Sequence, residues 1–182
     1  MNWRFARRHG RSLLVLIIGI AVVLPAVPMW ARVHPPRVAL DDDPGRHGLR
    51  YEEVAFPSPL DGTILRGWWL PALRPTGRAV VIVPGIDSNR LVSGISLRLA
   101  ADLVADGFDV LAFDLRDQGT SDGDTLSFGA REQDDVLGAL AFARARGARH
   151  VAVIGFSWIA RMAINKDLGL FLRTPLNRPI AY

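Results

Sequence analysis

The chain has 182 residues, with 22 lysine and arginine residues against 18 acids and no cysteine. The absence of cysteine excludes a disulfide scaffold, a cysteine-ligated zinc site and a thiol enzyme. The net charge of +4 does not indicate nucleic-acid binding, because residues 1–32 hold five arginines and no acid and the remainder is close to neutral.

An uncharged apolar segment occupies residues 12–31, behind an arginine cluster. As a helix, residues 13–30 would be about 27 Å long, close to the roughly 30 Å hydrocarbon core of a bilayer. We therefore predict a cytoplasmic flank and a single-pass membrane anchor in residues 1–32, with everything after Arg32 exported. A cleaved signal peptide, which would leave a secreted protein, is the alternative.

Residues 33–50 are rich in proline, glycine and charge and have no apolar period, so they predict a linker. Two β-rich runs, 51–56 and 63–70, flank Asp61-Gly62 and predict a hairpin with a tight turn. Residues 79–84 form a continuous apolar run, which is typical of a strand buried on both faces.

A helix is expected next, with Ser88 as its cap and Gly107 at its end. Its buried face would be the four-residue row of Leu91, Ile95, Leu99 and Leu103. Residues 108–113 predict another buried strand, 132–146 a second helix and 150–155 a further apolar strand. This order predicts an α/β fold in which parallel strands are joined by crossover helices and chemistry lies at the carboxyl ends of the strands.

Three loops follow the ends of these parallel strands: PGIDSNR from Pro84, DLRDQGTSDGD from Asp114 and GFSW from Gly155. A glycine, any residue and a serine between a strand and a helix form the first half of a nucleophile elbow. The tripeptide alone fits a serine that caps the next helix equally well. Its position after the fifth strand favours the nucleophile.

Together the motifs PGIDSNR, FDLRDQGTSDGD, SFGAREQDDVLGAL and RARGARHVAVIGFS resemble the α/β-hydrolase fold family, particularly its bacterial membrane-anchored serine hydrolases. The likeness covers residues 51–158 and ends just after the elbow. It implies an ester or peptide hydrolase with Ser157 as nucleophile, a histidine base oriented by an aspartate, and the backbone N–H groups of Trp158 and Ile86 as oxyanion donors. It implies no cofactor and no metal.

The resemblance also implies structural roles for Asp114, Arg116 and Gly119 in the loop after the fourth strand. The acids at the start of the second helix, Glu132, Asp134 and Asp135, could form a carboxylate cluster. Their position at a helix N-terminus instead predicts solvated side chains that complement the helix dipole.

The sequence departs from the family's pattern in three places. Pro84 replaces a histidine and Asp117-Gln118 replaces Gly-His, and neither change removes a catalytic group. Ile159 stands where the family has a small residue that lets helix and strand approach closely. A β-branched side chain there is expected to distort the elbow.

The sequence offers Ser157 no base. His9 precedes the apolar segment, and His34 and His47 lie in the predicted linker. His150 begins the strand that ends at Gly155, about 17 Å from the elbow, whereas a general base acts within about 3 Å. Only 25 residues follow Ser157, fewer than the roughly 30 of one βαβ unit, so we expect neither the triad's acid nor its histidine among them.

The likeness is lost from Ile159, so residues 159–182 are a divergent tail. We expect a C-terminally truncated hydrolase domain, produced by a frameshift or an early stop near codon 158. The downstream DNA, read in three frames, would test this. In such a domain the strand 150–155 is an exposed edge, a template for self-association.

Two functions remain open. The first is a membrane-anchored serine hydrolase whose activity is impaired by the missing acid and histidine. The second is a non-catalytic remnant or binding module anchored to the membrane. A nucleotide-binding domain is poorly supported, because no GxGxxG or GxxxxGK[ST] motif follows any predicted strand.

Overall fold

The computed structural model describes residues 17, 19–21, 23–24 and 27–156, which belong to two compact units, Met1–Pro35 and Pro36–Tyr182. In the first unit, the described residues between 17 and 33 are helical. No helix of the described residues is long and apolar enough to cross a membrane. Much of the predicted anchor, residues 13–16, 18, 22 and 25–26, lies outside the described part of the chain.

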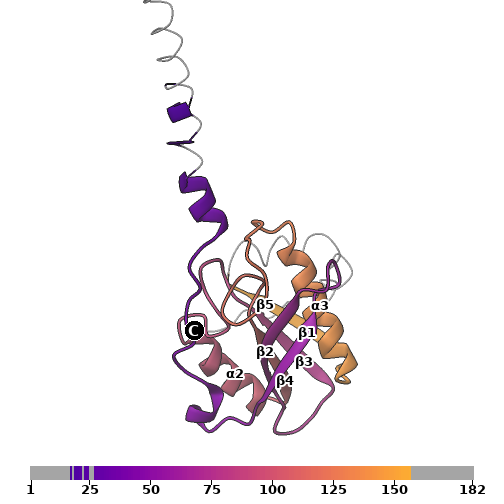
Figure 1. Cartoon of the computed structure of the whole chain (residues 1–182). Helices are drawn as coiled ribbons and strands as arrows, with labels where there is room; N and C mark the ends of the chain where they lie inside the picture. Colours follow the sequence, from indigo (N-terminus) through magenta and orange to yellow (C-terminus); the bar gives the residue numbers. More distant parts are fainter. Residues whose placement is uncertain (1–16, 18, 22, 25–26, 157–182) are drawn as a thin grey trace, which may run out of the picture. The chain divides into compact units, whose positions relative to one another are not determined.

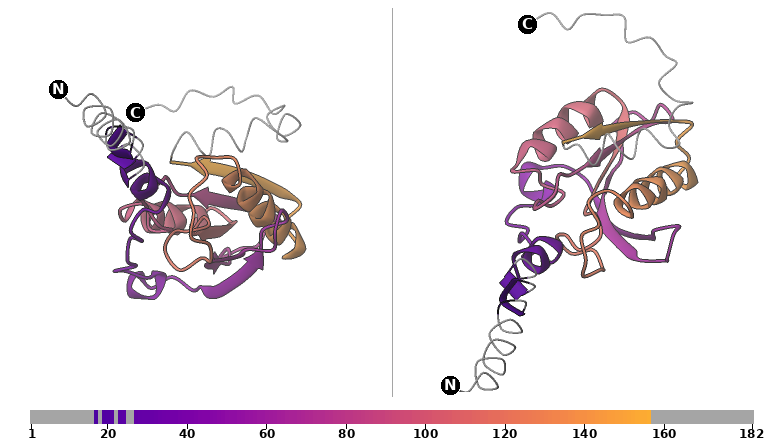
Figure 2. Two further views of the ribbon diagram at one scale, coloured as in Figure 1. Left: turned by 45° about the horizontal axis from the view of Figure 1, so that its top comes forward. Right: turned by 90° about the horizontal axis from the view of Figure 1, so that it is seen from above.

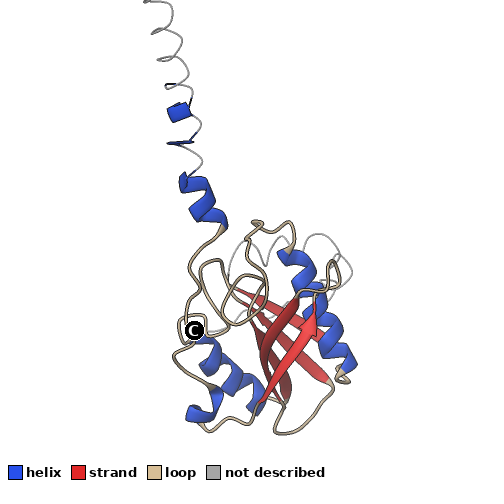
Figure 3. Cartoon of the chain, in the orientation of Figure 1, coloured by secondary structure: helices blue, strands red, loops and turns tan. Residues whose placement is uncertain are grey.

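The second unit is built on a five-stranded mixed sheet with the order β1-β2-β4-β3-β5 (Figures 1 and 3). β1 (Glu52–Pro57) and β2 (Ile64–Leu70) form the predicted antiparallel hairpin, and β2 also pairs antiparallel with β4 (Phe108–Phe113). β3 (Arg78–Val83) lies parallel to both β4 and β5 (His150–Gly155). The predicted α/β order is confirmed, and the carboxyl ends of β3, β4 and β5 share one edge.

Helices cover both faces of this sheet (Figure 2). α3 (Glu132–Ala145) packs on the face that holds Trp69 and Leu111, whereas α2 (Ile95–Ala105) packs on the face that holds Trp68 and Val110. Neighbouring residues of one strand thus serve opposite cores, as strand geometry requires. β3 is buried on both sides, as its unbroken apolar sequence predicts.

The first crossover helix begins later than predicted. α2 starts after Gly94, and Ser88 does not cap it. Residues 92–94 all have positive φ angles, of 46°, 54° and 82°, which turn the chain before the helix can begin. Ile95 is 51% exposed, so the predicted row lies at the margin of the contact. The buried side chains are Ser96, Leu97, Ala100 and Val104.

The segment from Pro36 to Leu49 differs from the linker predicted for residues 33–50. Leu40 and Leu49 pack against the core beneath α2, and the short helix η1 (Pro44–His47) lies between them, capped by the side chain of Asp43. Two apolar residues nine positions apart form no sequence period, which explains why the pattern indicated a linker. Residues 36–49 are therefore part of the folded domain.

Candidate active site

Two described loops follow the parallel strands at their shared edge. Loop A, residues 84–94, follows β3, and loop B, residues 114–124, follows β4. Ile86, the predicted oxyanion donor of loop A, is half-buried against the core beneath α3. The N–H of Phe156 donates to the carbonyl of Val83 at 3.1 Å, which holds the end of β5 beside the start of loop A. Ser157 and Trp158 come next and lie outside the described residues.

Arg90 of loop A and Asp114 of loop B form a buried ion pair, with side-chain exposures of 1% and 0%. Asp114 Oδ2 accepts from Arg90 Nη2 at 2.6 Å and from Nε at 3.1 Å, while Oδ1 accepts from the Arg90 N–H at 2.7 Å. The N–H of Thr120 donates to Oδ2 at 2.8 Å. These contacts give Asp114 the structural role expected of it and fix loop A to loop B.

Gln118 is a second connection between the loops, which the sequence showed only as a departure from the family's pattern. Its buried amide, when its nitrogen faces loop A, donates to the carbonyls of Gly85 at 3.0 Å and Ser88 at 3.2 Å. These carbonyls flank Ile86. The glutamine at the family's histidine position therefore braces the loop that carries the predicted oxyanion donor.

Two of the three acids at the start of α3, Glu132 and Asp135, are buried, so the prediction of solvated side chains is wrong for them. Asp135 is fully buried and pairs with Arg116 at 2.7 Å. Glu132 is also fully buried and accepts hydrogen bonds from the N–H groups of Ser127 and Gly129 at 2.7 and 2.6 Å. The partners of these two acids lie earlier in the chain than the helix. The helix dipole explains acids at this position but does not indicate that they are buried against such partners. The carboxylates are structural.

Arg116 extends this network to the turn between β1 and β2, where it contacts Asp61 at 2.8 Å. Hydrogen bonds from Thr63 and from Arg116 hold the pKa of Asp61 well below its usual value of 3.8. A carboxylate with a lowered folded-state pKa stabilises the fold at pH values above its unfolded pKa. This stabilisation is lost as the pH falls through the window below that value.

We expect Asp61→Asn to be less stable than the wild type at pH 7 and to lose less stability between about pH 4 and pH 2, because only the wild type has this carboxylate to protonate. Urea midpoints measured at pH 7, 5, 4, 3 and 2 check this. Asp102→Asn, at an exposed position of α2, controls for the loss of one negative charge. If the urea midpoint falls equally steeply with decreasing pH in the wild type and in Asp61→Asn, the lowered folded-state pKa of Asp61 is contradicted.

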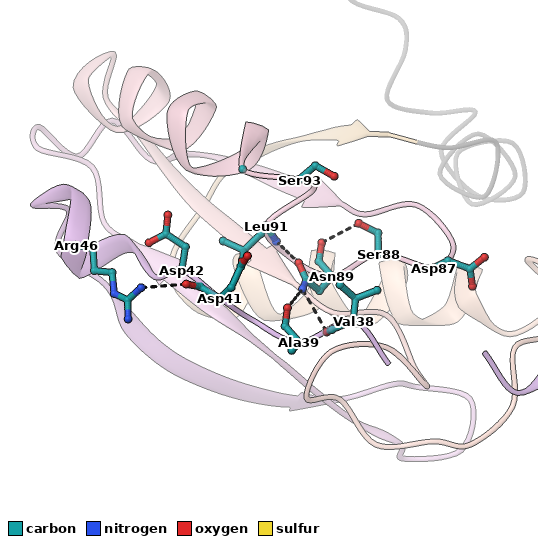
Figure 4. Close-up of a pocket in the computed structure, with 11 residues that line it drawn as sticks. Val38, Ala39, Asp41, Asp42, Arg46, Asp87, Ser88, Asn89, Leu91 and Ser93 are labelled. Carbon is teal, nitrogen blue, oxygen red and sulfur yellow. Dashed lines mark hydrogen bonds between the residues drawn. The ribbon is translucent and has the colours of Figure 1, made fainter. Parts of the chain in front are cut away.

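A pocket of about 580 Å³ opens beside loop A (Figure 4). One wall is formed by residues of loop A, including Asp87 and Asn89, and the other comes from the N-terminal segment: Val38, Ala39, Asp41, Asp42 and Arg46. A hydrogen bond from His47 lowers the pKa of Asp42, so this carboxyl group is ionised at neutral pH. The lining favours a polar ligand over a long hydrocarbon chain.

Neither histidine in the described part of the second unit is placed to act as a base at the ends of the parallel strands where loops A and B lie. His150 pairs in register with Arg78, the first residue of β3, so it lies at the amino ends of the parallel strands. Loops A and B lie at the opposite ends. His47 Nε2 lies 2.7 Å from Asp42 Oδ2. Among the residues that the structure describes, no cluster of histidine and acidic side chains could hold a metal ion.

Solved structures with a similar fold are α/β hydrolases. The esterase Pf2001 of Pyrococcus furiosus is 29% identical, with a TM-score of 0.65 over 72% of this chain and 49% of the esterase. A putative α/β hydrolase of Agrobacterium tumefaciens is 26% identical, with a TM-score of 0.53 over 62% of this chain and 54% of its own. An α/β serine hydrolase without a lid from Xanthomonas campestris, 20% identical, shares the fold with a TM-score of 0.54 over 63% of this chain and 54% of its own.

No protein-family model and no curated protein match the chain. It spans about half the length of the solved structures that it matches. The strand order β1-β2-β4-β3-β5, with a helix on each face, defines a mixed α/β domain whose loops gather at the carboxyl edge of its parallel strands. Within that class, the chain has the α/β-hydrolase fold, which it shares with these solved structures.

Proposed function

We propose that the chain is a serine hydrolase that acts on esters or peptides through Ser157. The hydrogen bond from Phe156 to Val83 carries this proposal, because it holds the residue before Ser157 against the strand end from which loop A leads to Ile86. Ser157 Oγ would attack the carbonyl carbon and lose its proton to a base. The N–H groups of Ile86 and Trp158 would hold the oxyanion of the tetrahedral intermediate. Its collapse would break the ester or amide bond, release the alcohol or amine with the proton, and leave an acyl-enzyme that water hydrolyses to the acid and free Ser157.

We infer that this chain turns substrate over slowly. His150 begins β5 and Gly155 ends it, so His150 lies at the strand end away from Phe156, and His47 is engaged by Asp42. Ile159 replaces the small residue of the elbow. A triad enzyme without its base retains about 10³–10⁴-fold acceleration over water, from oxyanion binding and substrate binding alone.

A second proposal concerns location: residues 13–30 anchor the chain in a membrane, with the domain outside. It is supported by the arginine cluster that precedes the apolar segment and by the nearly neutral composition of residues 33–182. Extraction of membranes with alkaline carbonate distinguishes an anchored chain, which stays in the pellet, from a secreted one.

A fluorophosphonate probe, which reacts with activated serines, tests the hydrolase proposal. We expect slow labelling of the full chain, no labelling of Ser157→Ala, and unchanged labelling of Ser12→Ala, a serine that precedes the domain. Labelling that persists in Ser157→Ala would overturn the assignment of the nucleophile. A folded chain that never reacts would instead favour the non-catalytic binding module. Ile159 supports this alternative, because its side chain is expected to distort the nucleophile elbow.

A further inference from the structure

A short N-terminal segment, residues 37–39, bridges loops A and B. The Arg37 guanidinium donates to three carbonyls of loop B, those of Ser121 and Gly123 at 2.6 Å each and that of Gly119 at 3.3 Å. On the other side, Asn89 of loop A donates from Nδ2 to the carbonyls of Ala39 at 2.9 Å and Val38 at 3.3 Å (Figure 4). The segment thus binds one loop through a side chain and the other through its backbone.

The carbonyls that bind Arg37 belong to the part of loop B that holds Asp114. Ser121 Oγ donates to the Asp114 carbonyl at 2.7 Å, and the N–H of Thr120, between two of the bonded carbonyls, donates to the Asp114 carboxylate. Asp114 in turn binds Arg90, the neighbour of Asn89. Arg37 and Asn89 therefore close a ring of contacts that runs from the segment through loop B to loop A and back.

Arg37 suits this position because of its chemistry. A guanidinium offers five N–H donors in a planar fork, and its charge strengthens each hydrogen bond to a carbonyl. Arg37 itself is exposed, and its bonds at Gly119 and Gly123 lie at the surface. Substitution there removes contacts to the loops without opening a cavity in either core.

We propose that Arg37 is a positioning residue of the active site: by holding loop B it keeps loop A in the conformation that presents Ile86 and one wall of the pocket. A role for Arg37 in catalysis rests on the proposed hydrolase function, whereas the coupling of the two loops through Arg37 does not. Val38 and Ala39 of the same segment line part of the facing wall of the pocket. Its seating on the loops therefore also sets the pocket's width.

Hydrogen–deuterium exchange of the full chain tests the coupling. We expect Arg37→Ala, which removes three hydrogen bonds to loop B, to speed exchange at least about tenfold in peptides from both loops, the factor that corresponds to losing one charge-assisted hydrogen bond. Peptides from β3 and β4 should keep wild-type rates. Arg37→Lys should fall between, because an ammonium lacks the fork. Arg98→Ala, an exposed arginine of α2 with no role in the ring, is the matched control.

Unchanged exchange in loop A of Arg37→Ala would overturn the inference, even if loop B alone became faster, because Arg37 would then be only a local tether. Probe labelling of the same variants separates this result from failure of the proposed function. Coupled loops in a chain that never reacts would overturn the hydrolase proposal and leave the coupling established. If the wild type reacts with the probe and Arg37→Ala reacts at the same rate, the positioning role is overturned.

Discussion

Arg90→Met is expected to lower the free energy of unfolding by about 3–5 kcal/mol, because it leaves the Asp114 carboxylate charged and buried without its counter-ion. Asp114 is fully buried, and after the change only backbone N–H groups and the Thr120 hydroxyl would remain to bind it. A domain of this size has a total stability of about 5–15 kcal/mol. Urea unfolding followed by circular dichroism should show a large fall in the midpoint.

Arg66→Met is the matched control, because Arg66 also pairs with an aspartate of loop B but does so at the surface. The Arg66 and Asp122 side chains are 39% and 51% exposed. Exposed pairs contribute about 1 kcal/mol or less, so this variant should remain close to the wild type. Similar losses in Arg90→Met and Arg66→Met would show that burial of the pair is not what matters.

A double-mutant cycle with Asp114→Asn separates the pair from its surroundings. The asparagine keeps an oxygen for the backbone N–H groups but carries no charge, so the exposed Glu53, 3.5 Å away, would be the charged partner left to Arg90. We expect the double variant to be about 2 kcal/mol more stable than the sum of the two single losses predicts. Additive losses would mean that Arg90 and Asp114 contribute independently.

The sheet could be predicted from the sequence because its signals are local. The apolar run at 79–84 and the Asp61-Gly62 turn each lie within a few residues, and the strands lie within one or two positions of their expected bounds. The start of α2 could not be predicted in this way. Three successive residues with positive φ delay it, and only one of them, Gly94, is a glycine.

The connections around the candidate site were not predictable from local pattern. Arg116 binds Asp135, which is 19 positions later, and Arg37 binds carbonyls more than 80 positions later. Backbone acceptors carry no side-chain signal at all, so nothing marked residues 36–39 as more than a linker. The predicted role of Ser157 rests on sequence and resemblance, and it stays a prediction.

The buried ion pairs explain how loop B, which is rich in acidic residues, can pack at the carboxyl edge of the sheet. Loop B brings Asp114, Arg116 and Gln118 into the interior, where Arg90 pairs with the carboxylate of Asp114 and Arg116 pairs with that of Asp135 in α3. Such pairs cost more desolvation energy than apolar contacts would, so their value lies in fixing geometry. In this domain they fix loop A, which a catalytic role for Ile86 would require.

Gly119→Ala is expected to cost about 2–5 kcal/mol, the sum of left-handed backbone strain and overpacking. Gly119 has a φ of +46°, and a Cβ there would lie 2.2 Å from Asp114 Oδ2. The carboxylate cannot withdraw, since Arg90 and the N–H of Thr120 hold both of its oxygens. Relief of the clash would therefore break the link between the loops.

Gly48→Ala separates the two contributions. Gly48 has a φ of +69°, but nothing lies within 4 Å of the position of an added Cβ. Its alanine variant should lose only the strain component, about 1 kcal/mol. If the clash with Asp114 dominates, Gly119→Ala also accelerates amide exchange in loop A, because loop A is held to loop B by the Arg90–Asp114 ion pair. Gly48→Ala should not have this effect. Equal stability losses with no change in loop A would mean that Gly119 serves backbone conformation alone and that the carboxylate has room to move.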